Sequence, residues 1–191
     1  MHLRLAVGRA TLSIALVLGF ACKGEAQVPD RNASRANGYS PLQITENAKL
    51  YMEMASTPDK VKAYFSNYTR MSHDNSHGTQ VEYNAPDGRS YLWYPGSRTV
   101  TPGHWKVAEG LAPDQIHHYV DLCYLYSAAS IDPTNNSRGG NWECNRAWFA
   151  MIRTKERMAG NPFRLGFSPQ TPFILPPDET DLANLLGKVR R

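Results

Sequence analysis

Two histidines, His73 and His77, come closer to metal-ligand spacing than any other pair in this chain. Histidines four residues apart share one face of a helix and could hold one ion between them. The intervening Asp-Asn-Ser and the glycine that follows are instead typical of a turn, and a third ligand would have to come from His104, His117 or His118. Solvated loop histidines are the better interpretation. We predict no metal site and no cofactor, and a metal-binding envelope protein is a lesser alternative.

Cys123 and Cys144 are the only cysteines that follow the predicted export signal. Thiols oxidise in the compartments that exported proteins reach, so the pair predicts one disulfide. It would close a loop of about 20 residues and stabilise the fold by about 3 kcal/mol. A catalytic thiol needs a base and a reduced state, and zinc needs three or four ligands. Neither set of partners accompanies these cysteines in the sequence, so we interpret them as structural.

Four carboxylates, Glu82, Asp87, Asp121 and Glu143, fall in the part of the chain that has a strand-like pattern. A pair of carboxyl groups at the right separation hydrolyses glycosides. The sequence gives no separation, and the turn Pro-Asp-Gly already explains Asp87. The chain carries none of the common motifs of serine hydrolases, zinc proteases or nucleotide enzymes. Whether it is an enzyme stays open at this point: a non-catalytic role is favoured, and a small envelope hydrolase acting on glycan or peptidoglycan is the alternative.

Five aromatic residues form the candidate ligand-binding surface: Tyr91, Trp93, Tyr94, Trp105 and Trp142. Tyrosine and tryptophan combine an apolar body with a polar tip, which suits the wall of a binding groove. The same residues also suit the buried face of a sheet, so core packing is the competing interpretation. The segment 91–94 is apolar on both faces. One side can therefore be covered by a helix while the other lines a groove.

Helices are predicted at both ends of the segment 41–191. A first helix covers residues 42–54. The second has the clearer pattern, because Thr57 can cap it and Pro58 fits its first turn. Its apolar residues recur at helical spacing: Val61, Tyr64, Phe65 and Tyr68. Residues 180–188 have the capping and leucine pattern of a short C-terminal helix.

Between these helices the pattern changes to short apolar segments separated by turns rich in proline and glycine. The predicted strands are 80–84, 90–94, 99–101, 104–107, 118–126 and 142–152, and residues 151–159 are also compatible with a helix. Tight turns cannot form parallel crossovers. We therefore predict an α+β domain with a curled antiparallel sheet or half-barrel, short N-terminal helices and a short C-terminal helix.

The predicted disulfide also constrains the order of the strands. Cys123 lies inside one strand, and Cys144 lies near the start of the segment beginning at Trp142. A bridge between them requires these two strands to be neighbours across the polar loop 127–141.

Several short motifs carry a resemblance to a known group of proteins. They are the hairpin Tyr91-Leu92-Trp93-Tyr94-Pro95-Gly96, then Trp105-Lys106, Cys123-Tyr124 and Trp142-Glu143-Cys144. In these motifs the chain resembles small secreted proteins of alphaproteobacteria that form a family of unknown function. The resemblance covers about residues 80–150. It implies a bacterial envelope setting and transfers no activity and no catalytic residues.

The N-terminus has the pattern of an export signal. Basic residues precede an uncharged apolar segment at 10–21, and cleavage after Ala26 would leave Gln27 as the new N-terminus. We predict a signal peptide at 1–26, a flexible leader at 27–40 and one globular domain at 41–191. Cys22 offers a minority alternative, a lipid anchor. However, lipoprotein signals usually carry leucine three residues before the cysteine, where this chain has glycine.

Composition then limits the class of partner. Removing residues 1–26 leaves 165 of the 191 residues and lowers the net charge from +4 to +2. This charge, without a stripe of lysine and arginine, gives no reason to expect nucleic acid. The leading hypothesis is a periplasmic or secreted non-catalytic domain. It would bind an envelope component or a partner protein through its aromatic sheet face, and would meet a membrane only if Cys22 is lipidated.

Overall fold

Two short helices begin the part of the chain that the structure, a computed structural model, describes, namely residues 41–111 and 118–189. They are α2 (Pro41–Met54) and α3 (Pro58–Phe65), as the sequence predicts. Thr57 caps α3, because its Oγ1 accepts a hydrogen bond of 3.3 Å from the backbone amide of Lys60. The helix ends at Phe65 because Ser66 is extended, with φ of −69° and ψ of 132°, and Asn67 then takes a left-handed conformation with φ of 58°. Tyr68 therefore begins a strand and does not extend the apolar face of the helix.

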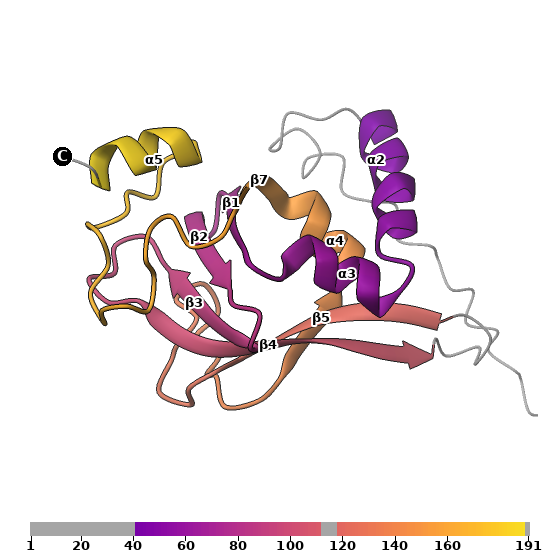
Figure 1. Cartoon of the computed structure of the whole chain (residues 1–191), viewed down its shortest axis with the longest axis horizontal. Helices are drawn as coiled ribbons and strands as arrows, with labels where there is room; N and C mark the ends of the chain where they lie inside the picture. Colours follow the sequence, from indigo (N-terminus) through magenta and orange to yellow (C-terminus); the bar gives the residue numbers. More distant parts are fainter. Residues whose placement is uncertain (1–40, 112–117, 190–191) are drawn as a thin grey trace, which may run out of the picture.

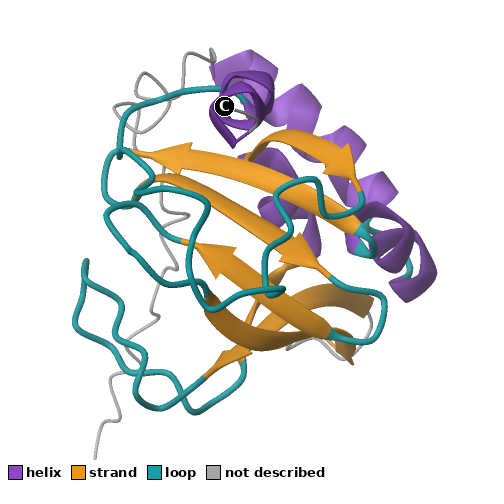
Figure 2. Ribbon diagram, turned by 60° about the vertical axis from the view of Figure 1, so that its left-hand side comes forward, coloured by secondary structure: helices purple, strands orange, loops and turns teal. Residues whose placement is uncertain are grey.

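Seven strands follow in one antiparallel sheet, which curls into a half-barrel (Figures 1 and 2). In space their order is β6-β5-β4-β3-β2-β1-β7, so β1 to β5 form a meander. The strands are β1 (Tyr68–Asp74), β2 (Gly78–Asn84), β3 (Arg89–Trp93), β4 (Thr101–Leu111), β5 (His118–Tyr126), β6 (Glu143–Arg146) and β7 (Thr154–Ala159). The predicted α+β class and the antiparallel sheet are confirmed.

Three details of the predicted strands are wrong. β1 was not predicted, because its first residue fits the helical spacing of α3 and the rest of it is polar except for Met71. Thr101 and the segment 104–107 belong to one strand, β4, in which Pro102-Gly103 makes no turn, and Thr99 forms only an isolated bridge with Gln170. The segment 142–152 divides into β6 and a helix, α4 (Ala147–Arg153), and the segment 151–159 is mostly β7. The helix forms where Ala147 and Met151, four residues apart, are both buried against the sheet.

One face of the sheet packs against the C-terminal part of the chain, and we call it the C-terminal side. Side chains alternate between the two faces of a strand, which places Met71, Val81 and Trp93 together on this side. They pack against buried side chains of residues 163–185, including two from α5 (Leu182–Val189). In Figure 1, α5 lies at the end of the molecule opposite α2.

The other face packs against α3 and α4, and we call it the helix side. Val61 and Phe65 of α3 and Met151 of α4 form a second core there with Trp105 of β4 and Leu122 of β5. Figure 1 shows α2, α3 and α4 grouped over one part of the sheet. These helices do not extend over the whole helix side.

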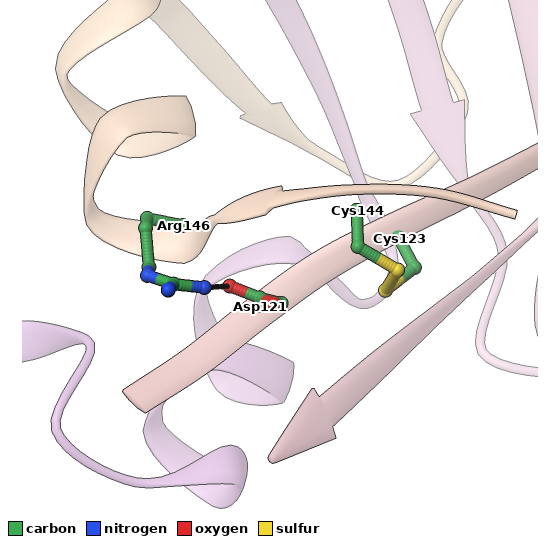
Figure 3. The surroundings of a disulfide bond; sticks show 4 residues. All are labelled: Asp121, Cys123, Cys144 and Arg146. Carbon is green, nitrogen blue, oxygen red and sulfur yellow. Dashed lines mark hydrogen bonds and ion pairs between the residues drawn. A yellow bond between two sulfur atoms is a disulfide. The ribbon is translucent and has the colours of Figure 1, made fainter. Parts of the chain in front are cut away.

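The predicted disulfide joins β5 to β6. Cys123 and Cys144 are directly paired in the antiparallel register, with Cα atoms 4.0 Å apart and sulfurs 2.04 Å apart (Figure 3). Asp121 and Arg146 are also paired, two residues from the cysteines along each strand. Arg146 donates a hydrogen bond of 2.6 Å to Asp121. The prediction that these strands are neighbours across the loop 127–141 is confirmed. A covalent bond and an ion pair thus hold a strand of only four residues at the edge of the sheet.

Residues 1–40 lie outside the described part of the chain. The predicted signal peptide, the lipidation alternative at Cys22 and the leader 27–40 therefore stay predictions. Within the described residues, no helix is long and apolar enough to cross a membrane.

Candidate functional site

A cavity of about 510 Å³ lies on the helix side of the sheet, between the strands, α4 and the loop 127–141. Its size is within the range of small-molecule sites, about 300–1,000 Å³. Leu122 belongs both to its wall and to the second core. The cavity therefore continues the helix side beyond the point where the helices cover it.

A row of directly paired residues crosses the floor of the cavity. Arg70 of β1 pairs with Glu82 of β2, Glu82 with Leu92 of β3, and Leu92 with Thr101 of β4. Paired residues of neighbouring strands point to the same face. A second pair, Ser72 and Gln80, lies beside this row. The strand register thus brings side chains from four strands together.

An ion pair at the centre of the floor is buried. Arg70 donates a hydrogen bond of 2.6 Å to Oε2 of Glu82, whose side chain is 4% exposed. The hydroxyl of Tyr126 donates a short hydrogen bond to the other oxygen, Oε1. Both oxygens of the Glu82 carboxylate therefore have donors, which compensates for much of the cost of burying its charge.

Two tyrosines of β5 form the wall next to this pair. The rings of Tyr124 and Tyr126 are stacked, with centroids 6.1 Å apart. Gly103 of β4 is paired with Tyr126. A Cβ at this position would come within 2.7 Å of the Tyr126 ring, so the glycine leaves room for the ring. Burial, followed by the negative charge of Glu82, raises the pKa of Tyr126 well above its ordinary value. Burial also raises the pKa of Tyr124. Both hydroxyls are therefore protonated at neutral pH.

Residues from a turn and a loop meet at the rim of the cavity. The Nδ1 atom of His77 lies 3.1 Å from the hydroxyl of Tyr94 and 3.9 Å from Oδ1 of Asp132. Burial alone would raise the pKa of Asp132, but hydrogen bonds from Thr134 and the neighbouring His77 outweigh burial and lower it. The loop 127–141 thus reaches the turn between β1 and β2 across the rim.

The helix α4 supplies the remaining wall. Phe149 lines the cavity and is exposed, and Arg153 forms an ion pair with Asp74 at the end of β1. Burial alone would raise the pKa of Asp74, but the backbone amide of His77 and the charge of Arg153 outweigh burial and lower it. The ion pair connects α4 to the far edge of the cavity.

The structure does not bring the five predicted aromatic residues together. Trp93 is 0% exposed and donates a hydrogen bond of 3.1 Å to the carbonyl of Phe173, and Trp105 is 6% exposed. Tyr91 lies on the C-terminal side, where its ring stacks on that of Tyr83. Trp93 and Trp105 are therefore core residues, Tyr91 packs against the core, and none of the three lines the cavity.

The other two predicted aromatics are accessible but lie apart. Tyr94 lines the cavity, where it contacts His77. Trp142 is 39% exposed, and the ammonium of Lys106 lies 4.2 Å from the centroid of its ring. Lys106 follows Trp105 in β4 and so points to the face opposite the cavity. Of the five, Tyr94 alone belongs to the cavity.

The four carboxylates are also divided. Glu82 and Glu143 both line the cavity. Asp87 pairs with Arg89 in its turn, and Asp121 pairs with Arg146 on the opposite face. Two of the four thus share one site.

Sequence reasoning missed the polar residues of the floor. Arg70, Ser72, Gln80, Tyr124 and Tyr126 were not singled out. A signal was present in β2, where polar residues alternate with apolar ones in Gly78–Asn84. A period of two places the polar set on one face, and polar residues at buried positions of a strand are the informative observation.

The two histidines with metal-ligand spacing do not converge. His77 lines the cavity, whereas Nδ1 of His73 lies 3.0 Å from the hydroxyl of Thr79. Within residues 41–111 and 118–189, no three histidine, cysteine, aspartate or glutamate side chains are placed to hold a metal ion. His117 is outside these ranges.

The cavity therefore offers hydrogen-bond donors and acceptors around a buried, fully bonded carboxylate. Comparison with models of protein families, with curated proteins and with solved structures found no match to this chain. The residues of the cavity are therefore the basis for assigning its function.

Proposed function

We propose that this protein is a non-catalytic binding domain of the bacterial envelope, and that its ligand occupies the cavity on the helix side of the sheet. The observation that carries the proposal is the polar floor formed by Arg70, Glu82 and Tyr126. The face of a sheet that packs against helices is usually covered by apolar side chains. A convergent set of polar groups in a cavity of this size is typical of a ligand site.

The contacts of Glu82 favour binding over hydrolysis. A general acid or base needs a carboxyl oxygen that is free to exchange a proton with the substrate. Arg70 and Tyr126 occupy both oxygens of Glu82. Two further carboxylates line the cavity: Glu143, which is exposed on an edge strand, and Asp132, which accepts hydrogen bonds from Thr134 and Asn135 within its own loop. Release of soluble sugar from peptidoglycan by the wild-type protein would contradict the non-catalytic proposal.

The envelope setting rests on three supports. The disulfide is typical of oxidising compartments. The predicted signal at 1–26 and the resemblance to small secreted proteins point the same way. Partner and compartment are thus part of the proposal.

Filling the cavity tests the proposal. Leu92 lines the floor, and Leu92→Trp would place a large ring in the space that a ligand needs. The purified protein is mixed with soluble envelope extract, and bound small molecules are measured by native mass spectrometry. We expect the wild type to retain a ligand and Leu92→Trp to lose at least 90% of it, because the ring and the ligand exclude one another.

Leu111→Trp is the matched control. Leu111 is exposed at the far end of β4, away from the cavity, so this variant should retain the ligand. Far-ultraviolet circular dichroism checks that both variants are folded. If the folded Leu92→Trp protein retained as much ligand as the wild type, the ligand would lie elsewhere and the proposed site would be wrong.

A further inference from the structure

Most charges around the cavity are compensated in pairs, and the remaining carboxylate, Glu143, is exposed to solvent. Arg70 pairs with Glu82, and Arg153 pairs with Asp74 at the edge. At the rim, Asp132 lies 3.9 Å from His77. An anionic ligand would meet Glu82 and Glu143, and a cationic ligand would meet Arg70 and Arg153. Neither sign of charge finds a site prepared to neutralise it.

Uncharged polar groups make up much of the remaining surface. They come from four strands, from the turn after β3 and from the loop 127–141: Ser72, Gln80, Thr101, Asn145, Ser97 and Ser137. A hydroxyl or an amide can both donate and accept hydrogen bonds. This combination matches a ligand whose own groups donate and accept at adjacent positions, which is the chemistry of a polyol.

Apolar surface is interleaved with these groups. Tyr94 and Phe149 present aromatic rings to the cavity, and Leu92 and Ile131 present aliphatic groups. An entirely apolar ligand would leave the polar floor without partners, which is costly. A sugar ring has hydroxyls around its edge and C–H groups on its faces. It can therefore use both kinds of surface at once.

We infer that the ligand of this cavity is a neutral saccharide, bound with its ring edge toward the uncharged polar groups of the lining and a ring face toward Tyr94 or Phe149. The inference rests on the proposed function and names its ligand class. The same chemistry can come from a free sugar or from the end of a glycan polymer. The test must therefore include both.

Calorimetric titration of the purified protein with a defined panel tests the inference. The panel is N,N′-diacetylchitobiose and its tetrasaccharide, both neutral, a uronic-acid disaccharide, the cationic disaccharide chitobiose and inorganic phosphate. We expect the neutral sugars to bind at least tenfold more tightly than the charged probes. Equal affinity for the disaccharide and the tetrasaccharide would indicate a free sugar, and tighter binding of the tetrasaccharide would indicate a polymer end.

Two variants assign the binding to the floor. Gln80→Leu removes an amide from the cavity, and we expect about tenfold weaker binding of the neutral disaccharide. Gln170→Leu makes the same change at an exposed loop position and should have no effect. Glu82→Gln leaves the charge of Arg70 uncompensated, so it should shift the preference toward the uronic acid. A purely structural role of Glu82 would not change the order of the panel.

These experiments distinguish a wrong ligand class from a wrong binding site. If Leu92→Trp abolishes retention of a ligand that is not a saccharide, the cavity is a binding site and the saccharide inference is overturned. If the neutral sugars bind equally well to wild type and Gln80→Leu, the floor does not recognise them and the inference is also overturned. Failure of the wild type to retain any ligand overturns the proposed function itself.

Discussion

Single side chains decide the character of the cavity. Glu82 is buried with two donors, and Arg70 lies between aromatic rings, with its guanidinium 5.5 Å from the centroid of Tyr124 and 5.9 Å from that of Phe65. The Nε atom of Arg70 is buried without a hydrogen-bond partner among the described residues. Such an arrangement costs stability, because buried polar groups gain little net energy even when they are paired. Apolar side chains could fill the same space, so the presence of the Arg70–Glu82 pair there is a reason to assign the pair a role in ligand recognition.

Asp74 gives the first prediction at this scale, a dependence of stability on pH. Its pKa in the folded protein is lowered, because hydrogen bonds from the His77 and Ser76 amides and the charge of Arg153 outweigh burial. A depressed pKa means that the ionised carboxylate stabilises the fold above the unfolded pKa, and that this contribution is lost as pH falls through the folded pKa. We expect Asp74→Asn to be less stable than the wild type by about 1 kcal/mol at pH 7. The difference should close between about pH 5 and pH 2.

Urea unfolding across this pH range measures the effect. Asp87→Asn is the control, because Asp87 also has a lowered pKa beside Arg89 but is fully exposed. Its ion pair is screened by salt, so its smaller effect should disappear at high ionic strength. A gap between Asp74→Asn and the wild type that stays constant with pH would contradict the assignment to charge.

Among the elements, β5 and the disulfide loop were the most predictable. The apolar run 118–126 and two cysteines determine a strand, a neighbour and a bridge. β1 could not be predicted from local pattern, because Tyr68 continues the helical spacing and the reversal depends on the left-handed Asn67. The Pro102-Gly103 sequence indicates a turn, yet Gly103 is needed to make room for the Tyr126 ring. This requirement comes from tertiary contact, which a local pattern does not contain.

The same division applies to the candidate site. Aromatic composition indicated a ligand surface but could not separate Trp93, which is buried, from Tyr94, which lines the cavity. Adjacent strand residues point to opposite faces, and the sequence does not say which face is covered. The Arg70–Glu82 pair depends on the register of β1 against β2, which the unpredicted β1 concealed.

The disulfide gives a prediction for the stability of the fold and of β6 in particular. Cys123→Ser together with Cys144→Ser should lower the free energy of unfolding by about 3 kcal/mol. We also expect a local effect, because β6 has only four residues and supplies Glu143 and Asn145 to the cavity. Hydrogen exchange in β6 and the loop 127–141 should rise more than in β2.

Reduction of the wild type provides the control for this pair of substitutions. A reductant should produce the same change in the wild type and none in the double variant. Non-reduced peptide mapping should link Cys123 to Cys144 in the wild type. Alkylation of both cysteines without prior reduction would show that the bridge is absent from the isolated protein.

At the scale of the whole molecule, the sheet is covered on both faces by different parts of the chain. Residues 160–189 cover the C-terminal side, and helices from the N-terminal part and α4 cover only part of the helix side. The cavity lies on the part of the helix side that the helices do not cover. Its position therefore follows from how the chain is distributed over the two faces of the sheet. The disulfide then holds the loop that borders the cavity, so the site depends on oxidation of Cys123 and Cys144.

Export is therefore the prediction that connects compartment and site. If the full chain is expressed in a Gram-negative host, we expect cleavage after Ala26, a mature protein beginning at Gln27 and recovery from the periplasm or medium with the disulfide formed. Intact mass and N-terminal sequencing measure this. Ala26→Phe should retain the signal, because signal peptidase requires a small residue there. A lipid-modified N-terminus at Cys22 would instead place the protein on a membrane. Residues 27–191 made in a reducing cytoplasm should have free thiols and, by the argument for β6, weaker ligand binding that recovers on oxidation.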